Sequence, residues 1–120
     1  MDRAATGLYG EDIAVRYLAH QGYVILARRW RTRFGEIDVI AKKNNEIVFV
    51  EVKTRATASF GAPEDSVTLW KRRRLRLTAY SFLQSRNLSD ASFRIDVIAV
   101  TIQSGRPPLV WHLQSAVGED

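Results

Sequence analysis

The 120-residue chain has no cysteine, one methionine and two histidines. Without cysteine, neither a disulfide framework nor a zinc site built on thiolates can form. The histidines His20 and His112 lack the spacing of metal ligands, and both are expected at the surface or at a helix end. No apolar run approaches the ~20 residues that span a bilayer, and no apolar stretch near the N-terminus suggests a signal peptide. We therefore expect a cytoplasmic protein with no membrane contact.

Hydrophobic residues make up 46% of the chain, enough to form the core of one domain. We expect this domain to span residues 1–115, with 116–120 as a flexible C-terminal tail. The net charge is +5, and basic residues are concentrated in 28–33 and 71–76. Such clusters are typical of proteins that bind a phosphate backbone, although a solvated basic surface with Trp30 in the core explains them equally well. The side chains expected to contact nucleic acid are Arg28, Arg29, Arg31, Arg33, Arg55, Lys71 and Arg72.

A β-hairpin is predicted across residues 36–53, where side chains alternate with the period of a strand. Asparagines at positions 44 and 45 tolerate the positive φ of a two-residue turn. This turn pairs residue 43 with residue 46, which places Asp38 opposite Glu51 and Glu36 opposite Lys53. The opposite face of the hairpin would then be entirely aliphatic, formed by Ile37, Val39, Ala41, Val48, Val50 and Val52.

Two carboxylates that face each other across a hairpin, roughly 4.5–5.5 Å apart at Cβ, repel one another. A divalent cation between Asp38 and Glu51 would remove that repulsion, and oxygen ligands favour magnesium or manganese. The alternative is an ordinary cross-strand ion pair between Glu36 and Lys53, with the other two carboxylates facing solvent. The apolar run before Glu51 favours the metal site.

The remaining segments complete an order of helix, three strands, helix and two strands. Helices are predicted over residues 7–21 and from 63 or 68 to 86, and strands over 23–29, 93–102 and 109–113, with a polar loop at 54–61. In the second helix, Lys71 and Arg72 should point toward the sheet, and Arg73 and Arg74 toward solvent. In the first helix, Glu11 borders the core-facing stripe, and Gly10 beside it allows a close approach of the helix to a neighbouring element. It is either a third carboxylate for the metal or a first-turn glutamate that interacts with the helix dipole.

Taken together, these motifs resemble the YraN-like family of small bacterial predicted nucleases, which belongs to the restriction-endonuclease-like superfamily near the archaeal Holliday-junction resolvases. The matching segments are Gly10-Glu11-x-x-Ala14-x-x-Tyr17-Leu18, Gly22-Tyr23, Arg28-x-Trp30-Arg31, Gly35-Glu36-Ile37-Asp38-x-Ile40, residues 48–55, Lys71-x-x-Arg74-Leu75 and Arg94-x-Asp96-Val97. The resemblance implies an α/β fold with an αβββαβ core, in which helices flank a mixed central sheet.

The resemblance also implies a set of catalytic residues, namely Glu11, Asp38, Glu51 and Lys53. Asp38, Glu51 and Glu11 would bind Mg²⁺ or Mn²⁺ together with the Val52 carbonyl. Lys53 would orient the attacking water or stabilise charge in the transition state. One departure from the superfamily pattern is the isoleucine, in place of proline, that precedes Asp38.

The expected function is therefore metal-dependent endonucleolytic cleavage of DNA, with branched or flapped structures as candidate substrates. Cutting a junction twice would call for a homodimer, but the sequence identifies no interface. Two alternatives stay open. One is a non-catalytic nucleic-acid-binding protein that retains the nuclease fold, and the other is a regulator whose basic clusters meet an acidic protein.

Overall fold

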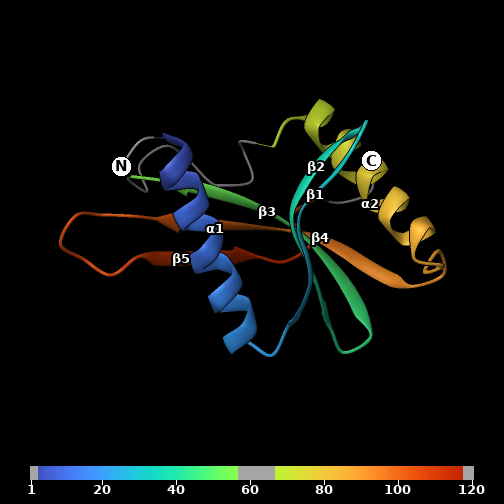
Figure 1. Cartoon of the computed structure of the whole chain (residues 1–120), viewed down its shortest axis with the longest axis horizontal. Helices are drawn as coiled ribbons and strands as arrows, with labels where there is room; N and C mark the ends of the chain where they lie inside the picture. The colour runs from blue at the N-terminus through green and yellow to red at the C-terminus, as the bar shows by residue number, and fades with distance from the viewer. Residues whose placement is uncertain (1–2, 57–66, 118–120) are drawn as a thin grey trace.

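A computed structural model of the chain describes residues 3–56 and 67–117 (Figure 1). The elements follow the predicted order of one helix, three strands, a second helix and two strands. Their bounds are α1 Arg3–His20, β1 Val24–Thr32, β2 Gly35–Lys43, β3 Glu46–Arg55, α2 Leu69–Ser85, β4 Ser92–Thr101 and β5 Leu109–Leu113. The expected αβββαβ core is confirmed, and a fifth strand extends it.

The five strands form one mixed sheet in the order β1-β2-β3-β4-β5. Strands β3 and β4 are parallel, and every other neighbouring pair is antiparallel. A parallel pair needs a crossover connection, and α2 provides it between β3 and β4 (Figure 1). Helix α1 packs on the cluster around Val48 and Ile98, and α2 packs on the cluster around Phe49 and Phe82. Each face of the sheet therefore has its own buried core.

Local sequence signals fix the ends of several elements. Gly22 ends α1 with φ +90°, and the N–H of Tyr23 donates back to the Leu18 carbonyl at 3.0 Å. Thr68 caps α2, since its hydroxyl accepts the N–H of Lys71 at 3.2 Å. Other bounds differ from the prediction. Helix α1 begins at residue 3, β1 continues to residue 32, and β3 runs to residue 55 into the predicted polar loop. Residues 57–66 of that loop lie outside the described ranges.

The hairpin register is confirmed from Lys43 opposite Glu46 to Val39 opposite Val50. The two turn asparagines have φ values of 53° and 66°, as a two-residue turn of this kind requires. The ladder ends at the Val39 pair, so β2 and β3 separate just where the charged residues begin.

The prediction that Ile37 shares a face with Val39 is wrong. Ile37 packs with Ile40 and Phe49 in the α2-side core, whereas Val39 belongs to the α1-side core. Residues three apart on one face break the two-residue period of a strand. The alternation of β2 therefore changes at Asp38, between these two residues. Pairing with Trp30 of β1, which packs edge-on against Phe82, holds Ile37 on the α2 side.

His112 is not the surface residue that the sequence suggested. Its side chain is 6% exposed, and its Nε2 lies 2.7 Å from Oδ2 of the fully buried Asp96. Tyr17 OH lies 3.0 Å from the other ring nitrogen, and Arg94 Nε donates to Asp96 Oδ1 at 3.1 Å. A buried carboxylate requires such partners, and β5 supplies one of them. His20, in contrast, is exposed at the end of α1, as expected.

The C-terminal segment is ordered beyond the predicted tail boundary. Val117 is 7% exposed in the α2-side core, and its N–H donates to the Ile95 carbonyl at 3.3 Å. The expectation of a free tail from residue 116 is therefore wrong for residues 116 and 117, and residues 118–120 lie outside the described ranges. Across residues 3–56 and 67–117, no helix combines the length and the hydrophobicity needed to cross a membrane.

Candidate active site

Asp38 occupies the point where β2 and β3 separate. Its Oδ2 accepts the backbone N–H of Val52 at 2.8 Å. The side chain thus takes a hydrogen bond from β3 just beyond the last backbone pair between the two strands. This hydrogen bond holds the Asp38 carboxylate in a fixed position where the two strands separate.

Glu11 reaches the same region from α1. Gly10 makes this possible, because a Cβ at that position would collide with the side chain of Thr54 on β3. Glu11 and Asp38 both line a hollow of about 470 Å³. The other lining residues are Thr6, Gly7, Val52, Lys53 and Thr54. The sequence signal at Gly10 therefore correctly indicated a close approach of this helix to a neighbouring element.

The Glu11 carboxylate is buried without full compensation. Its side chain is 13% exposed, and Oε1 has no hydrogen-bond partner within the described part of the chain. Arg28 and Arg29 approach Oε1 only to 3.8 and 3.7 Å. Burial raises the pKa of Glu11, and the two arginines oppose that rise. A buried oxygen of this kind can accept a cation or a water molecule.

Glu51 is paired with a lysine of α2, which covers the face of the sheet opposite α1. It is 7% exposed, and its Oε1 lies 2.6 Å from Nζ of Lys71 on α2. The burial of Lys71 lowers its pKa, but the bond to Glu51 outweighs that effect and leaves the pKa above its usual value. The expected direction of Lys71, toward the sheet, is confirmed, and its contact is a carboxylate.

The electrostatics of the site centre on Asp38 and Lys53. Burial, followed by the charge of Glu51, raises the pKa of Asp38 to about 7. Burial, followed by the nearby Lys71, lowers the pKa of the Lys53 amine. Shifts of this kind cluster at functional sites, though structural ion pairs also produce them.

The donor set suits a hard divalent cation only in part. Glu11 and Asp38 offer carboxylate oxygens on one hollow, and one of these oxygens is buried and unpartnered. Among the residues that the structure describes, no group of three or more acidic or histidine side chains converges on a common point. Glu51 is tied to Lys71, which explains the missing third carboxylate. Glu11 and Asp38 therefore offer two of the oxygen ligands that Mg²⁺ or Mn²⁺ would need, while Glu51 is held by Lys71.

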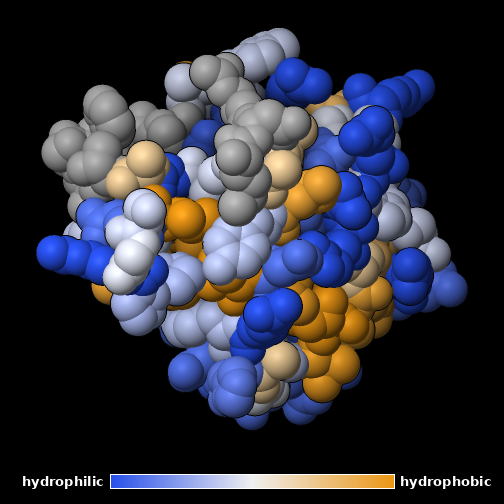
Figure 2. All heavy atoms as spheres, turned by 60° about the vertical axis from the view of Figure 1, so that its left-hand side comes forward, coloured by the Kyte–Doolittle hydropathy of each residue, from blue (hydrophilic) through white to orange (hydrophobic). Residues whose placement is uncertain are grey.

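Several of the predicted nucleic-acid contacts are engaged with acidic partners. Arg28 NH2 lies 2.7 Å from Asp12 Oδ1, and Arg31 NH2 lies 2.6 Å from Glu36 Oε2. Glu36 therefore pairs with Arg31 on β1, and the ion pair between Glu36 and Lys53, considered as the alternative to a metal site, is not formed. Arg28 and Arg31 therefore already have acidic partners. On the face drawn in Figure 2, hydrophilic side chains are interspersed with hydrophobic areas.

The other predicted contacts lie apart from this group. Arg33 packs over the ring of Phe34, 5.0 Å from its centroid. Arg55 Nε donates to Thr101 Oγ1 at 3.4 Å, which ties the end of β3 to β4. Arg72 Nε donates to the Val67 carbonyl at 3.1 Å, which fixes it at the start of α2.

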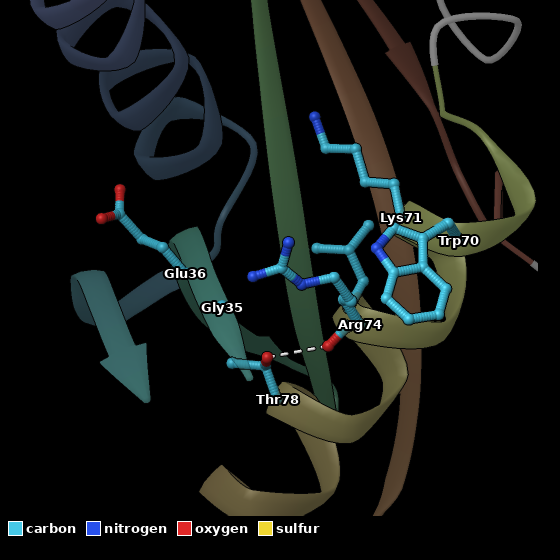
Figure 3. Close-up of a pocket in the computed structure, with 7 residues that line it drawn as sticks. Gly35, Glu36, Trp70, Lys71, Arg74 and Thr78 are labelled. Carbon is cyan, nitrogen blue, oxygen red and sulfur yellow. Dashed lines mark hydrogen bonds between the residues drawn. The ribbon is translucent and has the colours of Figure 1, made fainter. Parts of the chain in front are cut away.

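A second hollow lies between α2 and the start of β2 (Figure 3). Arg74 is exposed, as expected, but its Nε also donates to the Phe34 carbonyl at 2.8 Å, so the side chain reaches toward β2. Trp70 lies beside it on the first turn of α2 and is 69% exposed. No role was expected for Trp70 from the sequence. Its position directly before Lys71, at the start of the helix, was the available signal.

Comparison with known proteins agrees with the resemblance drawn from the motifs. The profile of "Uncharacterised protein family UPF0102" matches residues 10–100. A UPF0102 protein of Rhodococcus opacus (strain B4) is 43% identical over 112 residues, covering 93% of this chain and 95% of the relative. A UPF0102 protein of Sulfurihydrogenibium sp. (strain YO3AOP1) is 42% identical over 116 residues, covering 97% and 96%. One from Geobacter sulfurreducens is 42% identical over 110 residues, covering 92% and 86%. The chain therefore belongs to the UPF0102 family, also called the YraN family.

Proposed function

We propose that this protein is a metal-dependent DNA endonuclease that uses Mg²⁺ or Mn²⁺. The observation that carries the proposal is the position of Asp38, held by the Val52 N–H and flanked by Glu11 and Glu51. Two lysines, Lys53 and Lys71, adjoin these carboxylates. Carboxylates beside lysines suit hydrolysis of a phosphodiester, because the carboxylates can hold a cation and the lysines can contact the phosphate.

The residues would divide the reaction as follows. Asp38 and Glu11 would hold the cation, with the Val52 carbonyl as a further oxygen ligand. A bound divalent cation polarises the phosphate and lowers the pKa of attacking water. Lys53 places its amine against the phosphate oxygens, where negative charge develops as water bonds to phosphorus and the bond to the leaving sugar oxygen breaks.

Lys71 has a separate role in this scheme. In the resting protein it neutralises Glu51, and on binding it moves its ammonium group to the DNA phosphate. Glu51 is then released to complete the ligand set. Branched or flapped DNA is the proposed substrate, and a homodimer would allow two cuts.

The same ion pair favours one alternative. Because Lys71 already neutralises Glu51, part of the acidic site is stable without any cation. A non-catalytic nucleic-acid-binding protein with the nuclease fold is consistent with that arrangement. Such a protein would bind DNA without requiring Asp38 or Glu11.

A cleavage assay on branched, flapped, nicked and single-stranded DNA, with Mg²⁺ and with Mn²⁺, tests the proposal. Asp38→Asn and Glu11→Gln should each abolish metal-dependent cutting while the fold and DNA binding persist. Asp90→Asn, a change at an exposed acid outside the site, is the matched control and should cut normally. Absence of cutting on every substrate, with DNA binding intact, would favour the non-catalytic alternative.

A further inference from the structure

The hollow between α2 and β2 is separate from the carboxylate site but adjoins it. It measures about 370 Å³, within the range of about 300–1,000 Å³ typical of small-ligand sites. Its lining residues are Gly35, Glu36, Trp70, Lys71, Arg74, Leu75 and Thr78. Lys71 is shared by the hollow and the carboxylate site, since it lines the hollow and forms an ion pair with Glu51.

Trp70 offers a free aromatic face at this hollow. Its exposure of 69% contrasts with Trp30, which packs edge-on against Phe82 with ring centroids 5.2 Å apart. An indole left in solvent contributes little to the core, whereas a planar base can stack on it. Leu75, 5% exposed, adds an apolar surface to the same hollow.

The polar side of the hollow is positioned for a planar ligand with hydrogen-bonding edges. Arg74 crosses from α2 toward β2 near Trp70 (Figure 3), and its Nε is fixed by the Phe34 carbonyl. Gly35 keeps the space open. A Cβ there would lie 3.5 Å from Thr78 Oγ1 and 3.9 Å from the Arg74 guanidinium, so a larger side chain would enter the hollow. Glu36 lines the rim, but its carboxylate points away from Trp70 and Arg74 (Figure 3), and its Oε2 accepts from Arg31 NH2 at 2.6 Å.

We propose that this hollow binds one unpaired nucleobase, stacked on Trp70 and contacted at its edge by Arg74. Bases inside a duplex are stacked on their neighbours and cannot reach such a hollow, whereas an unpaired base can. The base site itself does not depend on the proposed nuclease function. Only the placement of the base beside the scissile phosphate rests on that function, because Lys71 is shared by the hollow and the carboxylate site. The substrate class is therefore nucleic acid with an unpaired nucleotide next to the cut, as in a flap or a branch point.

Binding without metal tests the proposal independently of cleavage. The probes are a labelled single-stranded oligonucleotide and its blunt duplex, measured by anisotropy in EDTA at one salt concentration. Stacking of one base contributes about 1–3 kcal/mol, so Trp70→Ala should weaken single-strand binding by roughly 5- to 150-fold. Duplex binding should change by less than about twofold on the same scale. Trp70→Phe should retain most of the affinity because it keeps an aromatic ring.

Trp111→Ala is the matched control, since Trp111 is 56% exposed on β5 and does not line the hollow. Equal losses on single strand and duplex, an equal loss in Trp111→Ala, or no loss in Trp70→Ala would each overturn the proposal. A single-stranded probe with 2-aminopurine adds a direct readout. Its fluorescence should be quenched by wild type and by Trp70→Phe, and unquenched by Trp70→Ala.

The two proposals can fail separately. If wild type prefers single strands through Trp70 but Asp38→Asn leaves cutting unchanged, the proposed active site is wrong and the base site stands. If Asp38→Asn abolishes cutting but Trp70→Ala binds single strands normally, the base site is wrong and the active site stands.

Discussion

Lys71 Nζ lies 2.6 Å from Glu51 Oε1, so a lysine of α2 forms an ion pair with a carboxylate of the β-hairpin. Glu51 is 7% exposed, and a carboxylate this buried requires a positive partner. The ammonium group of Lys71 is such a partner, and the proposed divalent cation would have to compete with it for Glu51.

Lys71→Ala should increase the affinity for Mn²⁺ by about tenfold, because a cation would no longer displace an ammonium group that is worth roughly 1.4 kcal/mol. DNA affinity should fall at the same time, since the proposed phosphate contact is lost. Titration calorimetry with Mn²⁺ and a binding isotherm with DNA measure the two effects. Arg73→Ala is the control. It removes an exposed cation two residues further along α2 and should leave the metal affinity unchanged. A lower metal affinity in Lys71→Ala would contradict the competition.

The raised pKa of Asp38 predicts a specific pH dependence. The folded pKa is about 7 and the usual value is 3.8, so between these values the folded protein holds a proton that the unfolded chain has lost. Without metal, this group's contribution to stability therefore falls as pH rises from about 4 to about 7, then levels off. A cation should bind more tightly at pH 8 than at pH 6, because binding requires the ionised carboxylate.

Thermal unfolding at pH 6 and pH 8, with and without Mg²⁺, measures this dependence. Wild type should be stabilised more by Mg²⁺ at pH 8. Asp38→Asn should show little stabilisation by the metal at either pH, and Asp90→Asn should behave as wild type. An identical response to Mg²⁺ in wild type and Asp38→Asn would remove Asp38 from the metal site.

Lys53→Ala should reduce the rate of DNA cleavage by about 10²- to 10³-fold, the usual effect of removing one group that stabilises a transition state. Metal and DNA affinities should remain close to wild type, because its proposed contribution falls in the chemical step. Single-turnover kinetics with saturating enzyme separate the step from binding. Lys42→Ala, an exposed lysine on β2, is the control. Unchanged cleavage in Lys53→Ala would leave that lysine without a catalytic role.

Asp96→Asn should lower the free energy of unfolding by about 3 kcal/mol, because it breaks a buried ion pair and leaves Arg94 with Glu46 as its remaining acidic partner. The fully buried carboxylate also accepts the N–H of Ser115 at 2.9 Å and contacts His112. Urea unfolding followed by circular dichroism measures the loss. The exposed Asp90→Asn control should change stability by less than about 0.5 kcal/mol. A small effect in Asp96→Asn would mean that the network rearranges without the charge.

The sequence by itself determined the features that depend on near neighbours. Two asparagines at the turn specified the hairpin register, because a two-residue loop and the period of a strand leave one pairing that keeps the faces apart. Gly22 marked the end of the first helix for the same kind of reason, and residue 68 was one of the two starts predicted for the second helix. The direction of Lys71 followed from the helical period, and the close approach of α1 followed from Gly10.

The tertiary structure alone decided which charges meet. The face change at Asp38 depends on β1, which holds Ile37 on the α2 side through its pairing with Trp30. The partner of Glu51 depends on the crossover that lays α2 over the sheet, and the burial of His112 depends on β5 reaching Asp96. Side-chain period is a local property of the backbone, whereas an ion pair between distant segments exists only after the sheet and both helices have packed.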